Sequence, residues 1–473
     1  MVGVESYGAY FPIWRLPRSE IGKVWGMPGG PGERAVANGD EDSLTMAVEA
    51  GFDCLVGKDP SQIDGLIFAT TTAPYKEKAG APIIATVLGL PRTAMTMDIT
   101  DTLRAGTTAI KLAKDAIESG SCKRVLVLAS DVRLSEQESF EEQMLGDGAV
   151  ALLISKENLI AELKDYYSIT DEIVGIWRKD KDEYIMHFED KIEDKFAFQA
   201  NVLEAIQGLV KKTGIEIKEI GKLACSYFDP RGLMAIAGKL GLNPMTQLAD
   251  PLFTSIGNTG VSAPLVGFAN ALENAEPGQE IILASHGDGA DALLFITTDK
   301  IKEPVPRMGI KGNLARKRVL WSYEQFAKFR KIIKKQFKYP RTSPVIHWRE
   351  REAELGWYGH KCKNCGTIQY PLVRICYVCQ SKDNFEKVKL SRKGTIFTFT
   401  KDYIRSGGAL PVPWCVIELE GGGRVFLTMT DCDPEEVKIG MEVEIVFRNL
   451  HQGSGYHNYY WRCRPLWKPE IQA

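Results

Sequence analysis

Short apolar runs alternate with amphipathic stretches along about the first 300 residues of the chain. The apolar runs predict buried strands at 64–70, 93–99, 123–130 and 280–286. Amphipathic helices are predicted between these strands. One begins at Asp42-Ser43 and places Leu44, Val48, Phe52 and Leu55 on one face. The others run from Leu103 to Ser119 and from Arg231 to Leu240. Strands that alternate with helices predict an α/β layered fold.

The same strand–helix–strand order occurs in two parts of this region. It runs through about 1–155 and again through 200–300, which predicts an internal duplication. The stretch between them, 160–198, carries more charge, and we expect it to form an insertion or a lid. Prolines and a glycine in 301–320 predict a linker after the second part.

A strongly basic stretch follows this linker. Residues 311–341 contain eleven Lys or Arg and one Glu. One interpretation is a solvated helix face. The other is a binding surface for the phosphates of coenzyme A or for an acidic partner.

The pattern changes after residue 360 to short strands at regular spacing. Four such strands are predicted in 394–400, 414–420, 424–430 and 441–447, with three consecutive glycines at 421–423 forming a turn. About five strands of this length are typical of a small OB-fold β-barrel.

Two CxxC pairs precede this all-β region. Cys362 and Cys365 form the first pair, and Cys376 and Cys379 form the second. Two such turns bring four thiolates to one tetrahedral site, which predicts a rubredoxin-like zinc ribbon. Because all four ligands come from the protein, the predicted Zn²⁺ has a structural role; a redox CxxC is the alternative interpretation.

Composition narrows the class of protein. The chain has 473 residues, 44% hydrophobic and 25% charged, and a net charge of −2, so two or three folded domains and no nucleic-acid partner are expected. No apolar run reaches the roughly 18 residues of a membrane span, and the first residues lack a signal-peptide pattern. We therefore expect a cytoplasmic protein with no membrane partner, whose remaining cysteines are mostly buried apolar residues.

The ribbon and the predicted barrel together resemble the acyl-CoA-associated OB-fold family, over about 322–466. Members of that family accompany thiolase-like enzymes and help to form the CoA channel. OB barrels also bind single-stranded nucleic acid. The acidic balance of the chain disfavours that alternative.

The first 300 residues resemble the HMG-CoA synthases and, more loosely, ketoacyl-ACP synthase III. The resemblance is carried in family order by six segments: 39–51, 69–80, 103–113, 146–155, 255–272 and 284–295. It implies a duplicated thiolase-like fold with five αβαβα layers, an acyl-CoA substrate, and a homodimer or a hetero-oligomer with another thiolase-like subunit. The expected domains are a condensing domain at 1–305, a basic linker and helix at 306–340, the ribbon at 341–385 and the OB fold at 386–473.

The family's three catalytic groups are all replaced in this chain. The nucleophilic cysteine corresponds to Leu103, the histidine to Phe228 and the glutamate to Thr71. The resemblance therefore does not extend to an acyl-cysteine mechanism, because the thiolate that would take up the acyl group is missing.

Other polar residues remain where the resemblance places the pocket. Asn258 matches an asparagine that condensing enzymes hold near the thioester, while His286 and Asp288 stand where HMG-CoA synthases have Tyr and Ser. With Tyr227 and Asp229, they are candidates for a relocated acid–base set. The alternative for His286 is a structural role at the end of a strand.

Three functions agree with this pattern. The first is an enzyme that makes or breaks a C–C bond next to a CoA thioester by aldol or retro-aldol chemistry, as in steroid side-chain aldolases, which pair a thiolase-like subunit with an OB-fold partner. The second is a catalytically inactive subunit that shapes the CoA channel of a partner enzyme. The third is an acyltransferase with an unusual nucleophile.

Overall fold

The computed structural model describes residues 1–173, 175–187, 190–227, 230–333, 342–404, 411–453 and 455–467. These residues form two compact units. The first contains 1–37, 42–85 and 90–327, and the second contains 38–41, 86–89 and 328–473. Within the described residues, no helix has the length and apolar character needed to cross a membrane.

A nine-stranded mixed sheet forms the centre of the first unit. Its order is β5-β4-β6-β7-β1-β8-β11-β10-β9. The strands are β1 (Gly3–Tyr10), β4 (Gly65–Ala69), β5 (Met95–Ile99), β6 (Val125–Asp131), β7 (Gly148–Ser155), β8 (Ala161–Thr170), β9 (Lys222–Ala224), β10 (Glu280–His286) and β11 (Gly289–Thr297). A smaller sheet contains β2 (Trp14–Pro17), β3 (Glu33–Val36) and β12 (Arg318–Val319).

The large sheet confirms the predicted duplication. From its middle outward, one half runs β1-β7-β6-β4-β5 and the other runs β8-β11-β10-β9. In each half the third strand pairs antiparallel with the second and parallel with the fourth. A parallel bridge between Leu223 and Leu248 stands where the first half has its fifth strand.

The second half begins earlier in the chain than the sequence indicated. We expected 160–198 to form an insertion or a lid, but Ala161–Thr170 is the strand β8, which pairs with β1 and β11. That part of the expectation is wrong. Most of its side chains after Leu163 are partly or fully exposed, so this strand carries the charged residues that suggested a surface segment.

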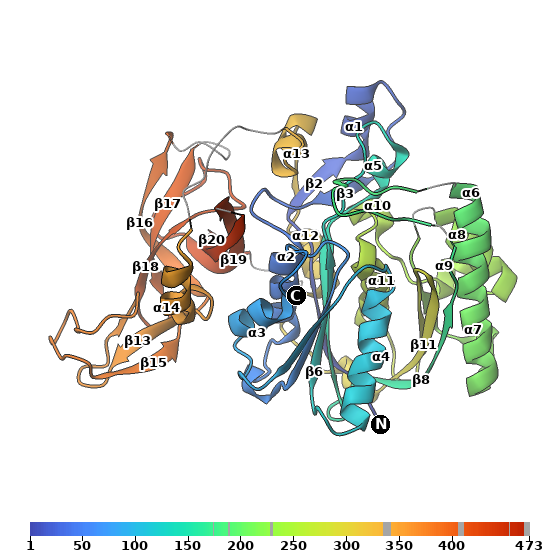
Figure 1. Cartoon of the computed structure of the whole chain (residues 1–473), viewed down its shortest axis with the longest axis horizontal. Coiled ribbons are helices and arrows are strands. Elements are labelled where there is room, and N and C mark those ends of the chain that lie inside the picture. Colours follow the sequence, from blue (N-terminus) through green and yellow to red (C-terminus); the bar gives the residue numbers. More distant parts are fainter. Residues whose placement is uncertain are drawn as a thin grey trace. The chain divides into compact units, whose positions relative to one another are not determined.

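Helices lie between the two halves of the sheet and on their outer sides, as Figure 1 shows for α4 (Ala105–Glu118), α11 (Ala263–Glu273) and α7 (Ala200–Thr213). The helix α2 spans Ser43–Cys54. α4 contacts β4, β6 and β7 of the first half and β11 of the second, whereas α11 contacts β9 and β10 and also β1 and β7. α2 packs against β1, β6 and β7, and α7 packs against β8, β10 and β11. This arrangement agrees with the five layers of the expected thiolase-like fold.

The predicted helices are present with small shifts at their ends. α2 starts at Ser43, and the Asp42 carboxylate accepts a hydrogen bond from the Thr45 amide at 2.9 Å, as expected of an N-cap. The remaining helical elements of this part are α1 (Arg18–Trp25), η1 (Pro60–Gln62), α3 (Ala81–Leu88), α4 (Ala105–Glu118), α5 (Phe140–Met144), α6 (Asp190–Ile192), η2 (Glu193–Gln199), α7 (Ala200–Thr213), η3 (Ile217–Glu219), α8 (Pro230–Leu240), α9 (Pro244–Gln247), α10 (Phe253–Ile256), η4 (Gly260–Ser262), α11 (Ala263–Glu273), η5 (Asp299–Lys302), α12 (Gly309–Ala315) and α13 (Tyr323–Phe329); α2 ends at Cys54.

The second unit contains a ribbon and a five-stranded barrel. The ribbon strands are β13 (Tyr358–Cys362), β14 (Ile368–Gln369) and β15 (Phe385–Lys389), preceded by α14 (Pro344–Glu354). The barrel order is β18-β17-β16-β19-β20, formed by β16 (Lys393–Asp402), β17 (Val412–Leu419), β18 (Arg424–Thr428), β19 (Glu442–Gly453) and β20 (Tyr456–Pro465). A parallel bridge between Met429 and Cys463 joins its two end strands, which agrees with the predicted OB fold.

Candidate functional site

The turn between β5 and α4 contains Leu103, which the resemblance predicts at the position of the family's nucleophile. β5 ends at Ile99, Asp101 has a left-handed backbone (φ 71°), and α4 begins at Ala105. Leu103 lies in this turn and packs partly against the main core. A thiol at such a helix N-terminus would have a lowered pKa, but a leucine side chain offers only hydrocarbon.

The loop after β10 packs directly against this turn. A Cβ atom on Gly287 would lie 2.9 Å from the Leu103 amide nitrogen and 2.8 Å from the Thr102 hydroxyl oxygen. Only glycine permits this approach without movement of the α4 turn. The loop after β10 therefore positions His286 close to Leu103.

A small cavity of 30 Å³ lies at this junction. It brings together four positions that the sequence singled out, Leu103, Tyr227, Asn258 and His286. Its other lining residues are Ile176, Glu193, Ser226, Gly260, Pro264 and Ser285. A space of this size holds a water molecule, so an acyl group would enter only if side chains moved.

Asn258 is held in one orientation. Its side-chain oxygen accepts a hydrogen bond from Arg133 at 2.7 Å and another from the Gly260 amide at 3.0 Å. Its backbone amide donates to the Met144 carbonyl at 2.7 Å. Because the side-chain oxygen is engaged in this way, the amide nitrogen is directed toward Ser226, 3.4 Å away, in the lining of the cavity.

His286 ends β10 and is largely buried. Burial lowers its pKa to about 4, although the nearby Asp288 acts in the opposite direction. The ring stands edge-on to Phe198, with centroids 5.8 Å apart. Its Nε2 atom is buried and has no hydrogen-bond partner in the described part of the chain. A neutral imidazole with an unpaired nitrogen at a cavity can donate a hydrogen bond to a ligand oxygen.

Tyr227 lines the same cavity and stacks on Phe198, with ring centroids 4.0 Å apart and planes inclined by 7°. This contact fixes the plane of the phenol ring. Phe228, which the resemblance predicts at the family's histidine position, and Asp229 lie outside the described residues.

Asp288 is not brought to the cavity. It occupies the turn between β10 and β11 with a left-handed backbone (φ 48°), and its side chain is exposed. Its distance of two residues from His286 suggested a proton-transfer pair, but the turn directs it toward solvent. The structure thus gathers His286, Asn258 and Tyr227 without Asp288.

Thr71, which the resemblance predicts at the position of the family's glutamate, belongs to a hydrogen-bond network in this structure. The Thr71 hydroxyl and amide both donate to the buried carboxylate of Asp131, at 2.9 and 2.7 Å. Asp131 also accepts hydrogen bonds from Thr70, Thr72 and the Val261 amide. This network connects β6 to the loop before α11. Thr71 therefore has a structural role, and its hydroxyl group is not an acid–base group.

The sequence analysis missed Glu193. This carboxylate is 5% exposed and lines the cavity, at the first position of the π-helical turn η2. It lies in the charged stretch that we expected to be a surface lid. Nothing in the local pattern separates this buried glutamate from the other acidic residues of the stretch, so only the tertiary structure identifies it.

The four cysteines of the ribbon meet as predicted. Sγ atoms of Cys362 and Cys379 are 3.6 Å apart, as are those of Cys365 and Cys376, and all four lie within 4.8 Å of one another. Tetrahedral Zn–S bonds of ~2.3 Å require sulfur separations of ~3.8 Å. The donor set and its geometry therefore fit a zinc ion with no open coordination position.

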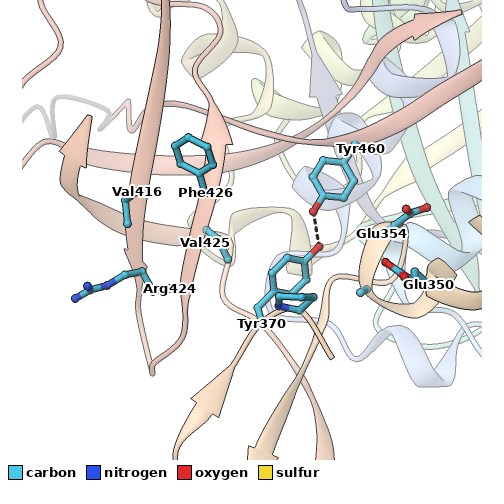
Figure 2. Close-up of a pocket in the computed structure, with 10 residues that line it drawn as sticks. Glu350, Glu354, Tyr370, Val416, Arg424, Val425, Phe426 and Tyr460 are labelled. Atoms are coloured by element: carbon cyan, nitrogen blue, oxygen red, sulfur yellow. Dashed lines mark hydrogen bonds between the residues drawn. The ribbon is translucent and has the colours of Figure 1, made fainter. Parts of the chain in front are cut away.

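A second, larger cavity of 530 Å³ lies within the second unit. Figure 2 shows the hydroxyl groups of Tyr370 and Tyr460 facing each other, 2.6 Å apart, with Glu350 and Glu354 beside them. Burial raises the pKa of both phenols, so both remain protonated. The described lining contains no thiol, imidazole or hydroxymethyl group.

The lowered pKa of His286 predicts a pH-dependent stability. The folded pKa is about 4, below the unfolded value of roughly 6.5, so between these values only the unfolded chain binds the proton. Stability should consequently fall as the pH drops through this window. Between pH 7 and pH 4.5, the unfolding free energy of the wild-type protein should fall by roughly 2 to 3 kcal/mol more than that of His286→Gln. Urea denaturation of both proteins at the two pH values measures this difference. An unchanged loss in the variant would contradict a buried neutral histidine.

Comparison with known proteins places both parts of the chain. Residues 97–171 match the family 3-Oxoacyl-[acyl-carrier-protein (ACP)] synthase III, and residues 387–448 match ChsH2, C-terminal OB-fold domain. Among solved structures, an HMG-CoA synthase complexed with CoA aligns with a TM-score of 0.63 at 21% identity, covering 72% of this chain and 92% of that one. A 3-oxoacyl-[acyl-carrier-protein] synthase III from Aquifex aeolicus aligns with a TM-score of 0.57 at 20% identity, covering 63% and 100%.

Curated relatives extend over most of the first unit. Hydroxymethylglutaryl-CoA synthase from Caldivirga maquilingensis is 31% identical over 345 residues, which cover 70% of this chain and 98% of the relative. The corresponding protein from Methanocaldococcus jannaschii is 31% identical over 352 residues, covering 71% and 100%. Together with the thiolase-like fold of the duplicated sheet, this similarity shows that the chain belongs to the hydroxymethylglutaryl-CoA synthase family, with a ChsH2-type OB-fold domain following in the same chain.

Proposed function

We propose that this protein makes or breaks a C–C bond next to the thioester carbonyl of an acyl-CoA, by aldol or retro-aldol chemistry and without an acyl-cysteine. The observation that carries the proposal is the cavity itself. It brings two hydrogen-bond donors, Asn258 and His286, together with Leu103, the residue that the resemblance predicts at the family's nucleophile position. Enolate chemistry needs such donors and a base, but no nucleophile.

The two donors support a binding site for the thioester oxygen. The Asn258 amide nitrogen is directed into the cavity lining, because Arg133 and Gly260 engage the side-chain oxygen. His286 is neutral at physiological pH and has an unpaired Nε2 atom at the cavity. Hydrogen bonds from both groups would strengthen as negative charge develops on the carbonyl oxygen, which is the property of an oxyanion hole.

No cysteine replaces the missing nucleophile in the described part of the chain. None lines the cavity. Cys225, next to Ser226 of the lining, is 2% exposed, and burial raises the pKa of its thiol to about 12. A thiol in this state is protonated and unreactive.

The test is exchange of the α-protons of acyl-CoAs with solvent. The full-length protein would be incubated in deuterated water with a panel of saturated and 3-hydroxy acyl-CoAs, and mass gain at the α-carbon would be followed. We expect uptake with at least one acyl-CoA, and a loss of roughly 100-fold or more in the exchange rate for His286→Ala. If an acyl-CoA binds measurably but takes up no deuterium, the proposed enzymatic function is wrong.

That negative outcome would favour the second function, a catalytically inactive subunit that shapes the CoA channel of a partner. The small volume of the cavity, 30 Å³, is the observation that agrees with it, because a filled pocket is expected of a scaffold. Under either function we propose a bound CoA thioester and a structural Zn²⁺ in the ribbon. A homodimer or a hetero-oligomer with another thiolase-like subunit is also part of the proposal.

A further inference from the structure

We propose that Glu193 is the proton-transfer residue of this cavity, an inference that rests on the function proposed above. Glu193 is the one carboxylate among the described lining residues of the cavity, which Asn258 and His286 also line. The family's own glutamate position, Thr71, lies on another loop and is engaged by Asp131. The acid–base group would therefore have moved to a different segment of the same pocket.

Local backbone geometry supports a specific position for this carboxylate. Glu193 begins the π-helical turn η2 directly before α7, and single wide turns of this kind are frequent at functional sites. A Cβ on Gly175 would lie 3.5 Å from the Glu193 Cδ and Oε1 atoms, so the loop before η2 lies close to the carboxylate. The side chain is 5% exposed, which is costly for a glutamate unless charged or hydrogen-bonding groups compensate.

A buried cation is close enough to compensate. Arg133 is completely buried, and burial lowers its pKa to about 10, while the negative charges of Asp131, Asp147 and Glu193 act to raise it. The same guanidinium donates to the side-chain oxygen of Asn258 at 2.7 Å. Arg133 thus links the carboxylate electrostatically to the group proposed to hold the thioester oxygen.

The roles of the two ionisable residues follow from their environments. Because His286 is neutral well below pH 7, it is a weak base and a suitable hydrogen-bond donor. Asp288 is exposed and away from the cavity lining. Glu193 is then the group that accepts a proton, as buried carboxylates do in other enolate-forming sites.

The proton-transfer steps balance without a further reactant. In the cleavage direction, the Glu193 carboxylate takes the proton of the 3-hydroxyl group, and C3 becomes a carbonyl carbon. The electron pair of the C2–C3 bond forms the thioester enolate, whose oxygen is held by Asn258 and His286. The protonated Glu193 then returns its proton to C2. Condensation is the reverse sequence.

The experiment compares α-proton exchange in the wild-type chain, Glu193→Gln and the matched control Glu172→Gln, a nearby exposed glutamate. We expect Glu193→Gln to lower the exchange rate at least about 100-fold, with calorimetric binding of the same acyl-CoA changed less than about threefold. The control should keep the wild-type rate.

A second variant distinguishes loss of the carboxylate from misfolding of the protein. Glu193→Ala leaves a space at the cavity, and added formate should restore part of its exchange activity if a carboxylate is the missing group. If the wild-type protein exchanges protons but Glu193→Gln retains its rate, or formate restores nothing to a folded Glu193→Ala, the assignment of Glu193 is wrong while the proposed function stands. If the wild-type protein itself shows no exchange with a bound acyl-CoA, the proposed function fails first.

Discussion

Cys362→Ser should abolish stoichiometric zinc binding and unfold the ribbon. The resulting loss of folding free energy should exceed that of any single core substitution in the second unit. The ribbon contains only short strands, β14 having two residues, and three of its large apolar side chains, Ile375, Tyr377 and Val378, are more than half exposed. So small an apolar core cannot offset the loss of chain entropy, and metal binding in such sites supplies on the order of 10 kcal/mol or more of the folding free energy.

Elemental analysis should find one zinc per chain in the wild-type protein and less than a tenth of that in Cys362→Ser. Hydrogen exchange should show loss of protection over 358–389. Cys432→Ser is the matched control, because Cys432 belongs to the same unit but lies outside the four-sulfur cluster. A variant that keeps its ribbon protection without metal would show that packing alone suffices, contrary to this prediction.

Arg448→Met should destabilise the second unit by about 3 to 5 kcal/mol. The Arg448 side chain is completely buried and lies 2.7 Å from Asp431, 3.2 Å from Glu41 and 3.6 Å from Asp40. Asp40 and Glu41 belong to the segment 38–41, which is part of this unit. Methionine has a similar volume but would leave three buried carboxylates without this cation.

The pH dependence gives this prediction a second test. Burial would raise the pKa of Asp431, but Arg448 and Arg464 outweigh it and hold the folded pKa below the ordinary value. Its stabilising contribution is therefore present above the unfolded pKa and is lost as the pH falls. In Arg448→Met the Asp431 carboxylate can be protonated instead, so the deficit in stability against wild type should shrink between pH 7.5 and pH 4.5.

Urea denaturation of both proteins at the two pH values measures this difference. Arg374→Met is the control, since Arg374 forms an ion pair with Asp383 but its side chain is 77% exposed, and a change below about 1 kcal/mol is expected. If Arg448→Met lowers the unfolding free energy no more than the control does, other groups compensate the charge of the buried carboxylates.

Several elements were determined by local sequence. Asp42 caps α2 because a short carboxylate before an amphipathic run satisfies free amide groups of the helix start. The apolar runs at 64–70 and 123–130 became β4 and β6, since continuous apolar runs suit strands buried on both faces. The CxxC spacing placed four sulfurs together because each pair spans one tight turn.

Other features were decided only by the tertiary structure. β8 carries charge because much of its length is partly exposed, so its sequence does not show that it is a strand in the middle of the large sheet. Asp288 is near His286 in sequence, yet a left-handed turn directs it to solvent. Glu193 is far from Asn258 in sequence, yet both line one cavity. Spacing along the chain determines which side chains share a helix face or a turn, whereas burial and the meeting of distant loops depend on how the two halves of the sheet and their helices pack.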